Sequence, residues 1–433
     1  MNHLLHRNTL VTGTVLLTAA GLLSRVIGFF YKIFLSRTIG AEGLGIYQLL
    51  FPVMALCFSL TSAGIQTAIS KCVAEESGVP TPARARLYLY CGLLFSVSLS
   101  LLLGVFLWNY ATWISAFFLG DLRCAPLLRI LAFSYIPCSI HSCINGYYYG
   151  LKKSLVPSLS QLAEQCARVG GVYLIYLILQ EKGMGITVSA AVWGIFFGEF
   201  AGMLVSLSAM GCGKWEGSIS SSAKALLQMA FPVTANRLFL TLFSGVENLL
   251  IPRQLRLFGY TQKEALSIYG ILTGMALSVI LFPTVLTNSV SVLLLPTISQ
   301  AKASHNTARI HRAVRATVEC CLALGLLCTV MLLLSGSFIG NRIFKNSLSG
   351  TFILTLSWIC PFLYLGSTLN SIFHGLGKPL TTLLLNLSAC GIRILFIFFL
   401  IPAVGIRGYL TGLLVSQIVS CSAALFLLYR CAS

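Results

Sequence analysis

Acidic side chains are scarce in this chain of 433 residues. Eleven Asp and Glu stand against 29 Lys and Arg, and the single aspartate is Asp121. An exporter of cationic compounds usually holds its cargo or a coupling ion on buried carboxylates, so the imbalance argues against such a cargo. Charged residues make up only 9% of the chain, and the basic ones form no stripe on a soluble domain. Nucleic acid is therefore excluded as a partner.

Sequence signatures of enzymes and metal sites are also lacking. The chain has no Walker A loop, HExxH, GxSxG elbow or Asp-rich motif, so we expect neither enzymatic activity nor a cofactor. Energy for any transport must then come from an ion gradient, the membrane potential or the substrate's own gradient. The 15 cysteines form no CxxC pair. Cys138, His141 and Cys143 resemble metal ligands, but residues five apart on a helix point to different sides, which favours buried small residues and no metal.

Long hydrophobic runs dominate what is present. Hydrophobic residues make up 57% of the chain, and the mean hydropathy is +0.88. Runs of about 20 apolar residues span a bilayer as helices. The pattern predicts an all-α integral membrane protein with about twelve transmembrane helices, and the eighth is expected to tilt or break near Pro283. The predicted spans are 10–36, 44–70, 87–108, 126–150, 156–180, 186–210, 225–250, 266–296, 313–334, 350–375, 380–402 and 405–429.

The chain repeats itself at an offset of about 225 residues. The segment 145–153 (NGYYYGLKK) matches 370–378 (NSIFHGLGK), and the same offset carries Gln161 onto Asn386 and Arg168 onto Arg393. An even number of spans per repeat gives two parallel halves. We therefore expect two six-helix bundles around a central cavity, formed by residues 1–218 and 219–433. Glycines four residues apart, at 194, 198 and 202 and at 408 and 412, predict close helix packing.

The first span carries two cations among apolar residues. Arg25 and Lys32 fall on one helical face with small and polar residues, while the opposite face is apolar. An ionisable residue at membrane depth is costly and is by default a candidate for function. Two on one stripe indicate an anion pathway. Snorkelling to the headgroups is the competing interpretation, and it suits Lys32 better. The stripe comprises Thr14, Thr18, Gly21, Arg25, Gly28, Lys32 and Ser36.

Other spans also carry charges at membrane depth. Arg237 lies on a polar stripe of the seventh span, and Arg393 lies in the eleventh. Arg168 follows Glu164 by one turn in the fifth span, so that pair can neutralise itself. Substrate-binding candidates are therefore Arg25, Lys32, Arg237, Arg393 and Arg168. Candidates for binding a coupling sodium ion or proton are Glu247, Glu199 and Glu164, of which Glu247 and Glu199 can also pair with the arginines across helices.

Lys and Arg are more numerous in the predicted loops on the side of the two termini. This bias places both termini in the cytoplasm. The basic segment 302–315 belongs to that side and is interpreted as an anchor on anionic lipid.

The N-terminal region resembles a known family. The stretches 24–29 (SRVIGF), 40–48 (GAEGLGIYQ) and 63–71 are similar to the stage V sporulation protein B and polysaccharide-exporter family. That family belongs to the multidrug/oligosaccharidyl-lipid/polysaccharide flippase superfamily, which includes lipid II flippases. In those flippases the arginine at the Arg25 position lines the cavity. The next flippase arginine is replaced here by Tyr31, and twelve spans stand in place of fourteen.

The resemblance implies a function in the bacterial cytoplasmic membrane. It implies a flippase that translocates an undecaprenyl-diphosphate-linked sugar, or a peptidoglycan precursor, by alternating access. The partners would be the polyprenyl-diphosphate-linked saccharide, membrane lipids and a sodium ion or proton. Two alternatives stay open: a cation-coupled multidrug exporter of the same superfamily, and a non-transporting scaffold in cell-envelope or spore assembly.

Overall fold

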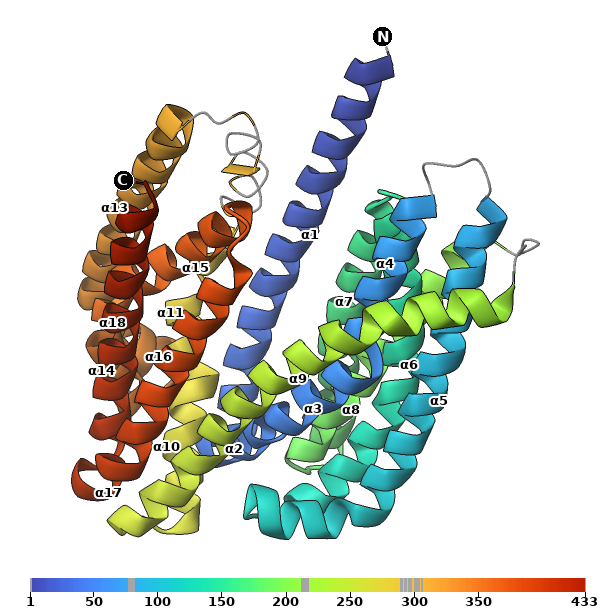
Figure 1. Ribbon diagram of the computed structural model, residues 1–433. Coiled ribbons are helices and arrows are strands. Elements are labelled where there is room, and N and C mark those ends of the chain that lie inside the picture. Colours follow the sequence, from blue (N-terminus) through green and yellow to red (C-terminus); the bar gives the residue numbers. More distant parts are fainter. Residues whose placement is uncertain are drawn as a thin grey trace. The chain divides into compact units, whose positions relative to one another are not determined.

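All regular elements in the described part of the chain are helical (Figure 1). The computed structural model describes residues 2–76, 82–211, 218–288, 291, 294, 298–299, 304 and 307–432. The α-helices in the first half are α1 Asn2–Thr38, α2 Gly40–Leu49, α3 Phe51–Phe58, α4 Gly64–Glu76, α5 Pro82–Ile114, α6 Cys124–Gly150, α7 Leu155–Glu181 and α8 Val188–Ala209. Those that follow are α9 Ile219–Phe258, α10 Gln262–Gly270, α11 Leu277–Leu281, α13 Thr307–Phe338, α14 Ser347–Leu356, α15 Cys360–Gly375, α16 Pro379–Phe399, α17 Ile401–Val404 and α18 Ile406–Ala432.

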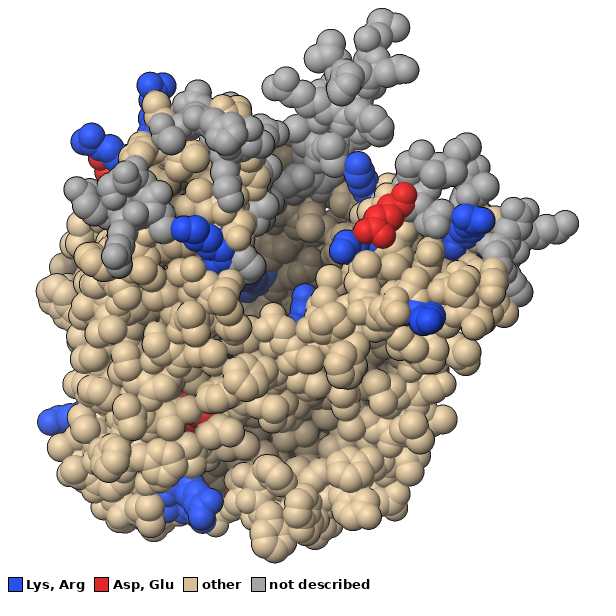
Figure 2. Space-filling view, viewed as in Figure 1, with Lys and Arg blue, Asp and Glu red and all other residues tan. Residues whose placement is uncertain are grey.

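Twelve helical segments of the described residues are long and apolar enough to cross a membrane, which confirms the predicted fold class. Each overlaps one of the spans expected from sequence. Leu16, Leu23 and Phe30 of α1 expose 37%, 52% and 63% of their surface, as expected of a face that meets lipid. Figure 2 shows broad areas of the visible surface that carry no Lys, Arg, Asp or Glu. The protein is therefore a multi-pass membrane protein; the side on which its termini lie stays a prediction.

The eighth span breaks at Pro283, as predicted. Its regular part, Gln262–Leu281, comprises α10, the π-helix η3 (Ile271–Ala276) and α11. Phe282 and Pro283 then form a turn, because proline lacks the amide hydrogen that continues a helical ladder. Part of the basic segment 302–315, including Lys302, lies outside the described residues.

Two turns of the chain have the same backbone hydrogen-bond pattern, which confirms the internal repeat at these positions. After α6, the amides of residues 151, 152 and 153 donate to the carbonyls of 147, 149 and 148. After α15, those of 376, 377 and 378 donate to 372, 374 and 373, the same pattern 225 residues later. Both turns contain a left-handed residue at the equivalent position, Lys152 with φ 59° and Gly377 with φ 70°. The segments that match in sequence therefore adopt the same conformation.

Equivalent spans also end in equivalent π-helices. The third span ends in η2 (Ser115–Leu119), and the ninth ends in η4 (Ile339–Ile343), which begins 224 residues later. Two further irregular segments are the π-helix η1 (Ser59–Ala63) in the second span and the 3₁₀ turn η5 (Ser357–Ile359) in the tenth. A π-helix adds a residue to a turn and redirects the side chains that follow it.

Packing divides the chain into two compact units. Unit 1 comprises residues 1–31 and 49–245, and unit 2 comprises 32–48 and 246–433. Each contains its own hydrophobic core. The core in unit 1 includes Ile69, Leu226 and Ile144, and the core in unit 2 includes Ile298, Leu369 and Phe373. The division of the repeat at residue 218 stays a prediction; by packing, residues 32–48 group with the later chain.

The glycine stripes pack as predicted. In unit 1, a methyl group built on Gly198 would lie 2.8 Å from the Glu164 carbonyl oxygen, so α8 approaches α7 too closely for a side chain. In unit 2, Gly412 packs in the same way against Phe396, where α18 crosses α16. Small residues at these positions let helix backbones come together without a hydrophobic driving force.

The two equivalent turns predict opposite responses to substitution. A side chain in the left-handed region costs about 1–2 kcal/mol, so Gly377→Ala should destabilise the protein by about that amount. Lys152→Gly removes the same strain. It also increases the conformational entropy of the unfolded chain, which costs roughly 0.5–1 kcal/mol of stability. We expect Lys152→Gly to be neutral or slightly stabilising. Unfolding in mixed micelles measures both, and a loss of stability in Lys152→Gly would contradict the strain argument.

Candidate functional site

Arg25 and Arg237 are both exposed on spans of unit 1. Arg25 lies in the second half of α1 and is exposed. Arg237 lies near the middle of α9, and its Nη2 donates to Thr67 Oγ1 of α4 at 3.4 Å. Each guanidinium is thus displayed on a membrane-spanning helix, where an anionic group can reach it.

The rest of the polar stripe on α9 serves helix packing. Thr241 Oγ1 lies 3.2 Å from Ser59 Oγ of η1, a hydrogen bond between two hydroxyl groups. Thr234 packs against Gly64, at the start of α4. Within unit 1, the polar stripe therefore holds α9 against the second span and leaves Arg237 exposed.

Lys32 is held inside unit 2. Its Nζ donates to Ser278 Oγ of α11 at 2.9 Å, and that hydroxyl in turn donates to the Gly274 carbonyl at 2.8 Å. A snorkelling lysine would extend its ammonium group toward the lipid headgroups. The Lys32 side chain is instead half-buried and bonded to a helix of unit 2. Its role in substrate binding stays a prediction.

Arg393 pairs with Glu247 in unit 2. Arg393 Nε donates to Glu247 Oε1 at 2.7 Å, and Tyr409 Oη donates to the same oxygen at 2.9 Å. The Glu247 side chain is only 7% exposed. The cross-helix pairing considered from sequence is thus present, and both residues have partners that account for their burial.

The second group of charges lies in unit 1 and joins three helices. Arg168 of α7 donates to Glu164 of the same helix, and its Nη2 lies 3.7 Å from Glu199 Oε1 on α8. On the other side, Glu199 Oε2 lies 2.7 Å from His141 Nε2 of α6. Asn145 Nδ2 lies 3.4 Å from His141 Nδ1. The Glu164–Arg168 pair expected from sequence is therefore part of a larger network.

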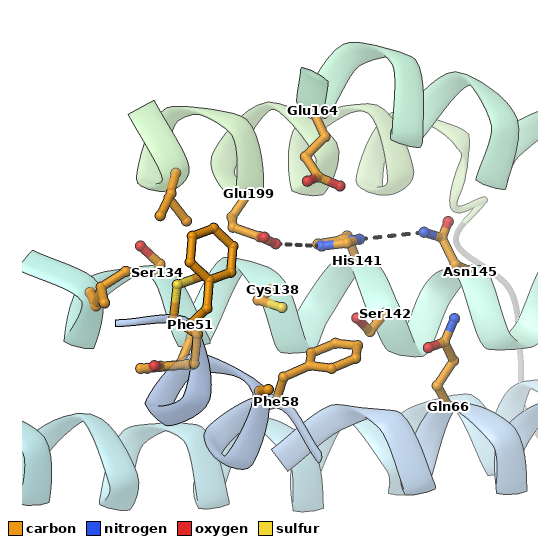
Figure 3. A pocket seen from close by; sticks show the side chains of 15 residues that line it. Phe51, Phe58, Gln66, Ser134, Cys138, His141, Ser142, Asn145, Glu164 and Glu199 are labelled. Carbon is orange, nitrogen blue, oxygen red and sulfur yellow. Dashed lines mark hydrogen bonds and ion pairs between the residues drawn. The ribbon is translucent and has the colours of Figure 1, made fainter. Parts of the chain in front are cut away.

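This network borders a cavity of about 390 Å³ in unit 1 (Figure 3). Figure 3 shows His141 between Glu199 and Asn145. Cys138 lies one turn away on the same helix, α6, and Glu164 faces His141 from α7. The other walls are largely apolar and come mainly from α3. The residues that line it are Phe51, Met54, Ala55, Phe58, Gln66, Leu131, Ser134, Tyr135, Cys138, His141, Ser142, Asn145, Glu164, Ile195 and Glu199.

Close helix packing fixes the position of these groups. The approach at Gly198 places Glu199 of α8 next to Glu164 of α7. A methyl group on Gly146 would lie 2.6 Å from the Gln66 carbonyl oxygen, so α6 meets α4 equally closely beside Asn145. The cavity is therefore built on rigid spans rather than on loops.

His141 is the participant that sequence reasoning missed. On sequence alone, the divergence of residues five apart on a helix argues against a common site for Cys138, His141 and Cys143. The structure agrees for Cys143, which does not line the cavity, but Cys138 and His141 are three apart and share a face. The three-residue spacing of Cys138 and His141, in a span that also carries Asn145, is the sequence feature that could have predicted this polar site.

Twelve membrane-crossing segments among the described residues, with ionisable side chains inside them and a largely apolar cavity that carries two carboxylates, are typical of multi-pass membrane transporters. The profile of the family described as "Polysaccharide biosynthesis protein" matches residues 10–302. The chain belongs to this family, which is part of the multidrug/oligosaccharidyl-lipid/polysaccharide flippase superfamily and is generally not catalytic.

Known relatives extend over most of the chain. It is 26% identical over 418 residues to stage V sporulation protein B of Bacillus subtilis, covering 93% of this chain and 80% of that protein. A multidrug resistance MATE family transporter in its inward-facing conformation matches with a TM-score of 0.75 at 15% identity, over 95% of this chain and 94% of that one. The lipid II flippase MurJ, in an inward closed conformation, also gives 0.75 at 15%, over 96% and 87%. The two structural matches show the fold.

Proposed function

We propose that this transporter flips a lipid-linked saccharide whose diphosphate is held by Arg25 and Arg237. An undecaprenyl-diphosphate-linked sugar or peptidoglycan precursor is the substrate class, and alternating access is the mechanism. The similarity to stage V sporulation protein B, and the fold shared with a lipid II flippase, support this assignment.

The observation that carries the proposal is the difference between two kinds of arginine. Arg168 and Arg393 are half-buried and hydrogen-bonded to carboxylates within their own units. Arg25 and Arg237 are instead exposed on helices long and apolar enough to span a membrane, where an ionisable side chain is by default a candidate for function. A guanidinium donates two parallel hydrogen bonds to phosphate oxygens, which makes arginine suited to a diphosphate.

A reconstituted flipping assay tests the proposal. The protein is incorporated into vesicles together with fluorescent polyprenyl-diphosphate sugars, and a membrane-impermeant reagent reports how much lipid has changed leaflet. We expect flipping of the diphosphate-linked sugars and much slower flipping of a matched lipid without phosphate. Equal rates for both lipids would contradict recognition of the diphosphate. No flipping of any substrate would favour the scaffold alternative.

The cavity of unit 1 favours a second candidate function. It brings two carboxylates, Glu164 and Glu199, to a space of about 390 Å³ with apolar walls, which suits an apolar cation. A cation-coupled multidrug exporter would use these carboxylates, and Glu199→Gln would abolish drug efflux while Arg25→Ala had little effect. The flippase proposal predicts the reverse dependence of transport on Arg25.

Ion coupling of the flippase is predicted to involve the same carboxylates. Glu247 is held by Arg393 and Tyr409 and does not line the cavity, whereas Glu199 and Glu164 line the cavity and share one arginine, Arg168. Glu199 and Glu164 are therefore the stronger candidates. We expect Glu199→Gln to remove the stimulation of flipping by an imposed sodium or proton gradient, while flipping without a gradient persists. A gradient response equal to that of the unmodified protein would exclude Glu199 from coupling.

A further inference from the structure

We propose that the cavity of unit 1 contains a binding site for a divalent transition metal ion of the zinc type. The ligands would be Cys138 Sγ, His141 Nε2 and a carboxylate oxygen of Glu199. One ligand atom from each of the three residues lies within 4.8 Å of the other two, and His141 Nε2 lies 2.7 Å from Glu199 Oε2. The site goes beyond the flippase proposal and does not depend on it.

The donor set selects the kind of metal. Thiolate, imidazole and carboxylate together suit zinc, whereas sodium, magnesium and calcium prefer oxygen ligands alone. Zinc bonds of roughly 2.0–2.3 Å place tetrahedral donors roughly 3.3–3.8 Å apart. The 2.7 Å contact between His141 and Glu199 needs to widen by only about 1 Å for both to bind one ion. The cavity leaves space for a water molecule as the fourth ligand.

The surrounding charges balance such an ion. Cys138 as thiolate, Glu164 and Glu199 supply three negative charges, and Arg168 supplies one positive charge. A divalent ion therefore makes the cluster neutral, which favours burial at membrane depth. Arg168 hydrogen-bonds Glu164 and lies 3.7 Å from the other oxygen of Glu199, so Glu199 Oε2 stays available for the metal.

Neighbouring polar groups can orient the histidine. Metal binding at Nε2 requires the proton of neutral His141 to lie on Nδ1, where a second residue usually accepts it. Asn145 lies 3.4 Å from Nδ1, and turning its amide presents the oxygen in place of the nitrogen. Ser206 Oγ, 3.4 Å from Asn145 Oδ1, can bond to either amide atom. Ser134 of the cavity wall has a buried hydroxyl without a hydrogen-bond partner among the described residues, so it can bond a water in the cavity.

Access is compatible with binding from solution. The side chains of His141 and Glu199 are 11% and 13% exposed, so the ligands are recessed but not sealed. The Cys138 thiol loses its proton to solvent when the metal binds, and the imidazole must be neutral. Apparent affinity should therefore fall as the pH is lowered.

Cobalt spectroscopy on the purified full-length protein tests the site. Cys166 and Cys320, the exposed thiols among the described residues, are first replaced by serine to remove adventitious sites. We expect one Co²⁺ per chain, with the thiolate-to-cobalt absorption band and the visible bands of tetrahedral cobalt, displaced by one equivalent of Zn²⁺. Failure to bind one equivalent, or binding without the thiolate band, would overturn the proposal.

Matched variants separate a built site from scattered binding. Cys138→Ser and His141→Gln should each weaken Zn²⁺ binding by more than the roughly 10–100-fold expected for an outer partner, and Asn145→Ala should stay within that range. Cys143→Ser is the control, because Cys143 is buried on the same helix but does not line the cavity. Circular dichroism and gel filtration check folding. A thiolate band that persists in Cys138→Ser, or is lost in Cys143→Ser, would overturn the assignment.

Discussion

Replacing Arg25 by alanine is expected to reduce flipping of the lipid-linked substrate by about 100-fold or more. A hydrogen bond to a charged group contributes about 1.5–3 kcal/mol, and a guanidinium gives two to a phosphate. About 1.4 kcal/mol corresponds to a tenfold change. The fold should survive, because Arg25 is exposed on α1 and not part of a packed core. The reconstituted assay measures the rate, and thermal unfolding in detergent measures stability.

Two comparison variants make the Arg25 result interpretable. Arg25→Lys keeps the charge but loses the paired donors, so its rate should lie between those of the alanine variant and the unmodified protein. Arg256→Ala removes an exposed arginine from the last turn of α9 and should leave transport unchanged. Normal flipping by Arg25→Ala would rule out its role as a diphosphate ligand. An equal loss of flipping in Arg256→Ala would show that the effect of Arg25→Ala comes from the change in net charge alone.

Replacing Arg393 by alanine is expected to destabilise unit 2 by roughly 3–5 kcal/mol. The substitution leaves the Glu247 carboxylate 7% exposed and without its counter-ion. Tyr409 still donates one hydrogen bond to it, but that bond does not replace a charge. A lower melting temperature and poor recovery of monodisperse protein would report the loss.

A double variant tests whether the buried charge is the cause. Glu247→Leu combined with Arg393→Leu removes both charges and should recover most of the stability, since apolar replacement of a buried pair is often neutral or better. Arg315→Ala is the matched control, because Arg315 pairs with Glu319 at the surface, where ion pairs contribute little. If Arg393→Ala stays fully stable but loses transport, Arg393 is a substrate ligand and not a structural partner of Glu247.

The positions of the spans follow from sequence because length and hydropathy determine them locally. A run of about 20 apolar residues must pair its backbone groups within a helix, and a proline such as Pro283 must interrupt that helix. The internal repeat could also be predicted from sequence, because Gly150 and Gly375 end equivalent helices. Both features depend on residues close together in the chain or at one fixed offset.

The partners of the charged residues did not follow from sequence. Arg393 meets Glu247 across 146 residues, and His141 meets Glu199 across 58. Such contacts depend on which helices pack together and on how each is rotated. Sequence periodicity gives the face of a helix but not its neighbour. The Glu164–Arg168 pair was predictable because both residues lie on one helix, one turn apart.

The assignment of residues 32–48 to unit 2 has a consequence for how the protein is made. This segment leaves the ribosome early, but Lys32 bonds a residue 246 positions later, and Arg37 bonds the Ile343 carbonyl 306 positions later. Leu44, which is fully buried and packs against Gly274, cannot reach its final environment until that later segment has been inserted. Contacts so distant in sequence form slowly and leave intermediates exposed to misassembly. In chains that end between α9 and α13, residues 32–48 should therefore remain unpacked, so these chains should be misfolded near the N-terminus as well as at the break.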